Sequence, residues 1–219
     1  EHVYKVEYAN SGFEPQHFEA VLDSMDFSQF EGFAYGSGFE AQPDLLVRIQ
    51  KRLPLIGNSP AVIQKLKYAP DFFALLTQLG IPHPEVGFDA LHNADGWLCK
   101  EAGGSGGTHV LNAKAGVTLP LGHYYQRIKP GVPVSMLFAA NGHEIKVVGF
   151  NQQWIAPVTS KPYRYGGIVG HAELPVSIKQ SMQEAAAKIV DAIGLRGMNS
   201  LDVVWNENEF WVLEINPRL

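Results

Sequence analysis

Three oxygen-bearing side chains, those of Asp202, Glu214 and Asn216, lie near the end of the 219-residue chain. They are embedded in two runs of apolar, β-branched and aromatic residues, 201–205 and 209–215, which a short polar segment separates. Such runs predict a β-hairpin in which Asp202 and Glu214 fall near the same rung and Asn216 shares the face of Glu214. Two carboxylates and an amide oxygen on one face form the oxygen-only site that Mg²⁺ prefers when it also holds phosphates.

An alternative for Asp202 and Glu214 is that both are solvated at the rim of an edge strand, as single strand carboxylates usually are. Against this, carboxylates inside apolar strands are costly to bury unless a partner compensates their charge. Pro217 and Arg218 follow directly, so a guanidinium group stands beside the three oxygen donors. The residues alone leave both interpretations open.

A lysine followed by small residues predicts a second element that could bind phosphate. Lys100 lies in the predicted strand 96–101, and the strand runs into Gly103, Gly104, Ser105, Gly106 and Gly107. The backbone N–H groups of such a loop can curl around an anion, because no side chain keeps the anion away. This is no Walker loop, since the lysine precedes the glycines. A glycine-rich hairpin tip is the alternative interpretation.

The elements that must position these groups form an α+β chain. Helices are expected at 15–22, 43–52, 61–67, 71–79 and 177–193, the first three beginning beside a proline and the last ending at Gly194. Strands are expected at 3–8, 32–35, 55–58, 96–101, 123–128, 134–139 and 145–150. The segment 159–170 is expected to be a polar loop.

Four motifs in order resemble those of the ATP-grasp carboxylate–amine ligases: GIPHP at 80–84, the strand lysine with its glycine loop, the strand at 123–128, and SLD followed by EINPR. The resemblance implies an ATP-grasp fold, in which two α+β subdomains grip ATP, preceded by a small α/β Rossmann-like domain. It divides the chain into a partial pre-ATP-grasp domain (1–84), a lid subdomain (85–130) and a metal-binding subdomain (131–219). It also leads us to expect further residues at both ends of the chain.

The resemblance assigns roles to individual residues. It implies that Asp202, Glu214 and Asn216 hold Mg²⁺, or Mn²⁺ in its place, and that Lys67 and Lys100 contact ATP phosphates beneath Gly104, Ser105, Gly106 and Gly107. Arg218 and Lys100 would act in catalysis. The adenine would meet Gln126, Arg127 and Ile128. The acid that commonly binds ribose a few positions later is absent, because Pro130, Gly131 and Pro133 fill that segment. As a lone helical lysine, Lys67 could also be solvated.

A basic residue beside two glycines marks a candidate substrate site. Arg164, Gly166 and Gly167 could meet a phosphate or a substrate carboxylate, or they could form a solvated loop. The histidines lack metal-ligand spacing such as HExxH, so nothing predicts zinc chemistry.

Composition narrows the class of function. The net charge of −5 and the absence of a Lys/Arg cluster argue against nucleic-acid binding. No apolar run approaches the length of a membrane span, and the single cysteine, Cys99, fits a reducing cytoplasm. We therefore expect small-molecule carboxylate and amine substrates and no membrane or nucleic-acid partner, with a homo-oligomer left open.

The predicted reaction follows the resemblance: a carboxylate is activated by ATP as an acyl phosphate and is then joined to an amine. Two further segments, YGSGFEAQPDLL and LPLIGNSP, resemble sequences of ATP-grasp proteins that belong to tetrahydromethanopterin- and methanofuran-linked one-carbon metabolism. Those proteins are similar to tyramine–glutamate ligase. Two alternatives remain, a non-catalytic nucleotide-binding regulatory or interaction module and a phosphorylating activation of formate.

Overall fold

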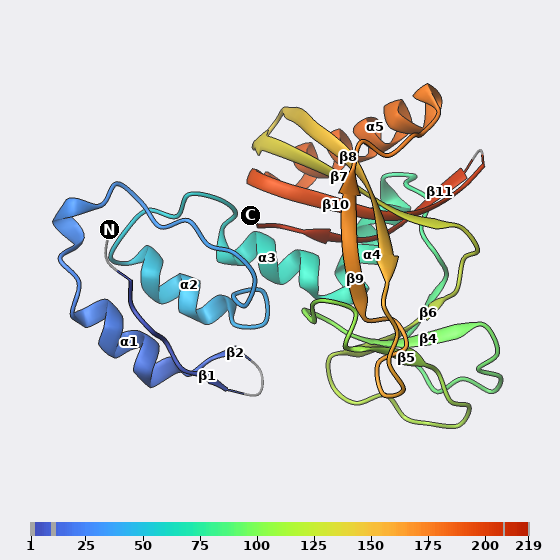
Figure 1. Cartoon of the computed structure of the whole chain (residues 1–219), viewed down its shortest axis with the longest axis horizontal. Coiled ribbons are helices and arrows are strands. Elements are labelled where there is room, and N and C mark those ends of the chain that lie inside the picture. Colours follow the sequence, from blue (N-terminus) through green and yellow to red (C-terminus); the bar gives the residue numbers. More distant parts are fainter. Residues whose placement is uncertain (1–2, 10–11, 208, 219) are drawn as a thin grey trace.

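The computed structural model describes residues 3–9, 12–207 and 209–218, so Asn208 of the expected hairpin turn lies outside the described residues. A small N-terminal lobe, residues 12–58, lies beside a larger body, and the described end of the chain runs back toward this lobe (Figure 1). The N-terminal elements are β1 (Tyr8–Ala9), β2 (Gly12–Phe13), α1 (Pro15–Asp23), the 3₁₀ helix η1 (Phe27–Gln29) and α2 (Pro43–Gln50). Helices α3 (Pro60–Lys67) and α4 (Ala69–Gln78) lead into the body.

Prolines at the first helical positions begin these helices, as the sequence predicts. Pro15, Pro43 and Pro60 each stand at a helix start, where a missing N–H costs nothing. The Ser59 side chain caps α3 by accepting a hydrogen bond from the Val62 N–H. The lobe has its own apolar core, which Ile63 of α3 completes: Phe18, Leu22, Tyr35, Phe39, Leu45, Leu46, Ile49 and Ile63.

A Rossmann-like domain before the ATP-grasp region is not shown by the structure. Among the described residues up to 84, the expected strands at 32–35 and 55–58 shrink to one parallel bridge between Phe33 and Leu55, and β1 pairs with β2 in an antiparallel hairpin. Pro54 and Gly57 flank the bridge, and a proline cannot donate to a sheet ladder. The regular structure of the lobe is therefore mainly helical.

The first half of the body is a four-stranded antiparallel sheet. Its strands follow the order β3 (Val86–Gly87), β6 (His123–Arg127), β4 (Trp97–Glu101) and β5 (Val110–Asn112). Lys100 on the inner strand β4 pairs with Tyr124 on one side and Val110 on the other. The glycine loop 103–107 leaves the end of β4, as predicted.

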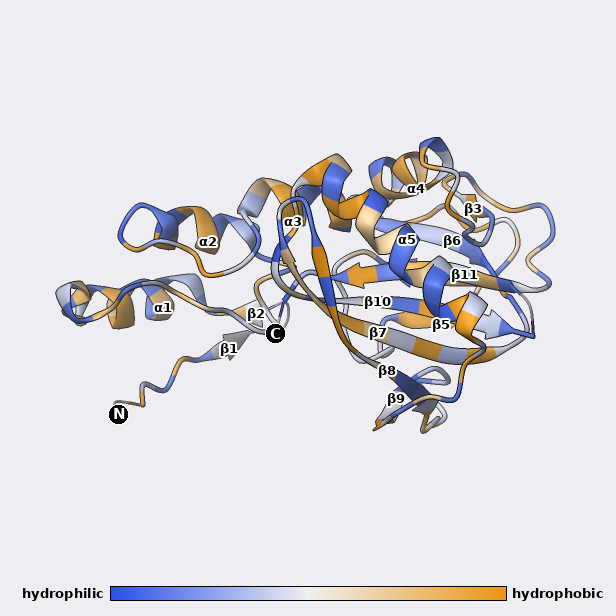
Figure 2. Cartoon of the chain, turned by 90° about the horizontal axis from the view of Figure 1, so that it is seen from above, coloured by the Kyte–Doolittle hydropathy of each residue, from blue (hydrophilic) through white to orange (hydrophobic). Residues whose placement is uncertain are grey.

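The second half is a five-stranded antiparallel sheet covered on one face by helices (Figure 2). Its order is β11 (Glu209–Asn216), β10 (Arg196–Asn206), β7 (Val132–Asn141), β8 (Ile145–Ile155) and β9 (Tyr165–Gly170), and α5 (Val176–Ile193) lies across it. Two expectations were wrong here. Strand β8 continues to Ile155 instead of ending at Phe150, and residues 165–170 of the expected loop form an edge strand.

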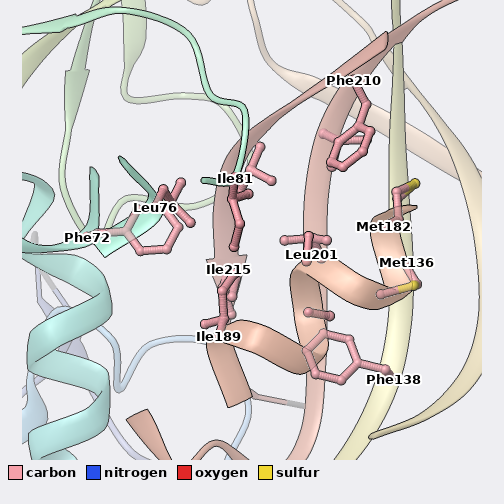
Figure 3. Close-up of a cluster of buried hydrophobic side chains, with 14 of the residues drawn as sticks. Phe72, Leu76, Ile81, Met136, Phe138, Met182, Ile189, Leu201, Phe210 and Ile215 are labelled. Atoms are coloured by element: carbon pink, nitrogen blue, oxygen red, sulfur yellow. The ribbon is translucent and has the colours of Figure 1, made fainter. Parts of the chain in front are cut away.

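Alternation along the strands separates core from site. Leu201, Val203 and Ile215 point into the core beneath α4 and α5, where they meet Phe72, Leu76, Met182 and Ile189 (Figure 3). Since successive side chains point to opposite faces, Asp202 and Glu214 point away from this core. Because the apolar residues next to each acid in the sequence are buried in the core, the side chain of the acid must point to the opposite face of the sheet.

Candidate active site

The hairpin of β10 and β11 brings together the three predicted metal ligands. Asp202 pairs directly with Glu214, and Ser200 pairs with Asn216 two residues away on the same face. Asn216 Nδ2 donates to Asp202 Oδ2 at 3.0 Å, and Ser200 Oγ donates to Asp202 Oδ1 at 2.8 Å. The rung predicted from the sequence is confirmed.

The two carboxylates on this face of the hairpin are suited to binding a cation. Burial and the repulsion of Glu214 raise the pKa of Asp202 well above its usual range. Burial alone would also raise the pKa of Glu214, but Lys67, Lys100 and His109 together lower it. Within the described residues no cluster of three His, Cys, Asp or Glu side chains forms a complete metal cage. Two carboxylates and one amide suit an ion that takes its other ligands from phosphate and water.

Lys100 faces these carboxylates across a cleft. The cleft has a volume of about 470 Å³ and is lined by Lys100, Gly107, Asp202, Glu214, Asn216 and Arg218 among others; we call it the central cleft. Burial lowers the pKa of Lys100, while Glu214 and Asp202 act to raise it. A smaller cavity of about 90 Å³, lined by Tyr124 and Val110, shares Lys100 and Glu214 with the central cleft.

The glycine loop closes one side of the central cleft. Gly106 O accepts a hydrogen bond from Tyr165 N–H at 2.8 Å, so the loop contacts the start of β9. Gly107 has φ +66° and lies against the backbone of Tyr163, with which a Cβ at this position would collide. A Cβ at Gly104 would collide with the ring of His109. These two positions have no room for a side chain.

Substituting Gly107 by alanine is expected to distort the loop and to weaken nucleotide binding at least about tenfold, because the methyl group must displace backbone. Gly116→Ala is the matched control outside the loop: Gly116 has a similar φ of +69°, nothing lies within 4 Å of a Cβ there, and it does not line the central cleft. It should cost about 1 kcal/mol of unfolding free energy and little affinity. Calorimetric ADP titrations and thermal unfolding compare the two variants, and equal affinities would contradict the role of this loop.

Lys67 is no solvated helical lysine. Its Nζ lies 3.1 Å from Glu40 Oε1 and 3.7 Å from Glu214 Oε2, and it donates to Asn216 Oδ1 at 3.5 Å. The remaining residue of the C-terminal motif, Arg218, lines the central cleft and donates its Nε to Glu40 Oε2 at 2.8 Å.

The residues expected at adenine lie apart from the central cleft. The Arg127 and Ile128 N–H groups already bond to the carbonyl oxygens of Glu85 and Gly96, both at 2.8 Å, and the guanidinium group of Arg127 donates to Asp95 O. Gln126 is buried, and its Nε2 finds no hydrogen-bond acceptor among the described residues. An orphaned buried donor on this strand fits a ligand that offers an acceptor, as a purine does.

The expected substrate residues are only partly placed at the site. Arg164 is exposed and donates its Nε to Ala156 O at 2.9 Å, outside the lining of the central cleft. Gly166 and Gly167 leave room for the ring of Trp154, which a Cβ at either position would meet. Their neighbours Tyr165 and Ile168 line the cleft instead.

Several residues at the site carry no local signal in the sequence. Glu40 and His109 reach it only through the tertiary fold. Ser200 lies two residues from Asp202 on one strand, and period-two alternation could have found it.

Two antiparallel sheets that face each other across a cleft, one with a lysine and a glycine loop and the other with paired acids, define the ATP-grasp class. The chain belongs to this family, because the sequence profile of the ATP-grasp domain matches residues 70–219. It is 21% identical over 233 residues to the carbamoyl phosphate synthase large chain of Halomonas eurihalina, covering 94% of this chain and 21% of that protein. The chain thus spans about a fifth of the curated relatives that it matches.

Solved structures share the fold. The biotin carboxylase domain dimer of Hydrogenobacter thermophilus 2-oxoglutarate carboxylase, in complex with MgADP and bicarbonate, superimposes with a TM-score of 0.72 at 13% identity, over 92% of this chain and 51% of that one. The L-amino acid ligase of Bacillus licheniformis gives a TM-score of 0.68 at 15% identity, over 94% and 53%. No helix in the described part of the chain could cross a membrane.

Proposed function

We propose that this chain is the ATP-binding part of a ligase that activates a carboxylate as an acyl phosphate and joins it to an amine. One observation carries the proposal. Asp202, Glu214 and Asn216 share one face of a hairpin, and this face meets Lys100 and the glycine loop in one cleft. Opposed cationic and oxygen-donor walls are what a metal-bound triphosphate requires.

The oxygen donors of Asp202, Glu214 and Asn216 are proposed to hold one or two Mg²⁺ ions, and the same donors would accept Mn²⁺. When bound, the metal neutralises charge on the β- and γ-phosphates. The orientation of Asn216 is already set, since its amide nitrogen bonds Asp202 and leaves the amide oxygen directed at a cation, at present Lys67.

We assign the nucleotide to both halves of the body. Residues 85–130 would form the lid, 131–219 the metal-binding subdomain and residues up to 84 the preceding domain. Lys67 and Lys100 would contact phosphate, with residues Gly104 to Gly107 closing over it. Gln126 would offer its orphaned Nε2 to adenine, with Arg127 and Ile128 beside it.

In the proposed reaction a substrate carboxylate oxygen attacks the γ-phosphorus, and ADP leaves. The amine then attacks the acyl carbon, phosphate leaves, and the amine loses a proton. The chain's task is to position the reactants and to offset negative charge, because phosphoryl transfer needs little covalent help. Lys100 neutralises phosphate oxygens, and the planar group of Arg218 steadies the transferred phosphoryl group.

The wall of the central cleft that β8 and β9 form indicates the kind of substrate. It is apolar and aromatic, and Trp154, Ile155, Tyr165 and Ile168 are each 44–49% exposed. Such a wall suits an amine with an aromatic ring. An aromatic amine substrate agrees with the resemblance to tyramine–glutamate ligase, so we propose a ligase of this kind, acting in one-carbon cofactor biosynthesis. We further propose that it acts in the cytoplasm, and the chain could form a homo-oligomer.

Release of ADP and phosphate from Mg-ATP tests the function. The panel contains glutamate, other amino acids, formate and aromatic amines such as tyramine, singly and in pairs. We expect phosphate release that requires a carboxylate and an amine together. Release with formate alone would identify formate activation instead. Binding of Mg-ATP without turnover by any combination would favour a regulatory or interaction module and contradict the ligase.

A further inference from the structure

One buried acid of the N-terminal lobe reaches two cations of the candidate active site. The Glu40 side chain is 2% exposed, and its two oxygens contact Lys67 Nζ at 3.1 Å and Arg218 Nε at 2.8 Å. A carboxylate so deeply buried is costly unless nearby charge compensates it. These two cations supply the compensation, and each lies more than twenty residues away along the chain.

The residues on either side of Glu40 in the sequence fix its position. Phe39 packs its ring against four other aromatic rings in or beside the core of the lobe, those of Phe13, Phe18, Phe33 and Tyr35, at centroid distances of 4.8–5.9 Å. Pro43 begins α2 three residues after Glu40. The backbone of Glu40 also approaches the glycine loop, since a Cβ at Gly103 would lie 3.6 Å from Glu40 O. The carboxylate is therefore presented on a rigid support.

Glu40 competes with the proposed metal ligands for the ammonium group of Lys67. The distance from Lys67 Nζ is 3.1 Å to Glu40, against 3.7 Å to Glu214 Oε2 and 3.5 Å to Asn216 Oδ1. The last two are oxygens of the proposed metal ligands. If Glu40 lost its charge, Glu214 would be the nearest remaining anion, and the ammonium group would be drawn onto it.

We propose that Glu40 is a positioning residue that holds the ammonium group of Lys67 back from Glu214 and fixes the guanidinium group of Arg218, so that the Glu214 carboxylate remains available to the metal. This inference rests on the proposed function. It adds a residue of the N-terminal lobe, outside the matched residues 70–219, to the machinery of the site.

The test is the Mg²⁺ concentration that half-saturates ADP binding, measured by calorimetry, which needs no turnover. For Glu40→Gln we expect this concentration to rise at least about tenfold, because Lys67 then competes with the metal at Glu214. Glu19→Gln is the matched control. Glu19 is also a carboxylate between two cations of the lobe, Arg48 at 3.1 Å and Arg52 at 3.2 Å, and it lies away from the cleft. It should keep the wild-type Mg²⁺ requirement.

A double variant separates positioning from mere support of the fold. Glu40→Gln/Lys67→Met removes the acid together with the competing cation, so it leaves no uncompensated ammonium group even if the single variant fails to fold. Because Lys67 is itself proposed to contact phosphate, the reference for the double variant is Lys67→Met. We expect the Mg²⁺ requirements of these two variants to agree within about threefold, a non-additive result that a structural role of Glu40 would not give. A wild-type requirement in Glu40→Gln, or an additive loss in the double variant, overturns the proposal. A wild-type protein that binds no Mg-ADP would instead overturn the proposed function.

Discussion

Glu214→Gln is expected to reduce ATP turnover at least about a thousandfold while leaving the fold intact, because it removes the carboxylate whose pKa Lys67, Lys100 and His109 lower and which is proposed to hold the metal. The side chain is 40% exposed and points into the cleft, away from the apolar core, so glutamine fits without repacking. Turnover is followed as phosphate release, and the fold by circular dichroism and thermal unfolding.

Glu209→Gln on the same strand is the control for this result. Glu209 pairs with Asn206 at the far end of the hairpin and is exposed, so its charge should not affect turnover. Normal turnover by Glu214→Gln would remove Glu214 from the proposed metal site.

Lys100→Ala is expected to weaken binding of ATP and ADP by about 10- to 100-fold, the value of a buried charge-assisted contact to phosphate. The lysine lies on an inner strand of its sheet and lines both the central cleft and the smaller cavity beside it, so no neighbour can easily replace it. Nucleotide affinity is measured by calorimetric titration in Mg²⁺.

Lys146→Ala provides the comparison for Lys100. Lys146 is an exposed lysine on strand β8, paired with Ala139, and does not line the central cleft. An unchanged affinity for Lys100→Ala, equal to that of Lys146→Ala, would exclude Lys100 from the phosphate site.

The hairpin was predictable because its information is local. Apolar residues at 201, 203 and 215 fix the buried face, so both acids had to lie on the opposite face. The register set by the short connection would place Asp202 opposite Leu213, and an irregularity between Asp202 and Val203 shifts the pairing to Glu214. The helices were predictable for a similar reason, since proline, serine and glycine mark their ends.

Strand β9 could not be predicted from local pattern. Its sequence, YGGIVG, is rich in glycine and reads as a loop, and the strand exists because Trp154 of β8 packs its ring against Gly166 and Gly167. The apolar wall of the cleft was therefore missed along with the strand. Its exposed residues Tyr165 and Ile168 have the character of a binding surface only once β9 is paired with β8.

Contacts between segments far apart in the chain could not be predicted from the sequence for a different reason. Asn58 is buried and donates to Asn199 Oδ1 at 2.8 Å and to Pro217 O at 3.0 Å, which ties the N-terminal lobe to the end of the hairpin. Glu40 and Lys67 meet in the same region. Neither hydrophobic periodicity nor motif spacing in the sequence predicts such pairs, because the partners are brought together by packing of the whole chain.

A crystal structure with Mg²⁺ and a non-hydrolysable ATP analogue tests the central claim most directly. We expect metal density at Asp202, Glu214 and Asn216, phosphates between Lys100 and the loop from Gly104 to Gly107, and Lys67 moved from Asn216 toward phosphate. A nucleotide bound elsewhere, or one bound in the cleft with no metal at Glu214, would contradict the proposed Mg-ATP site.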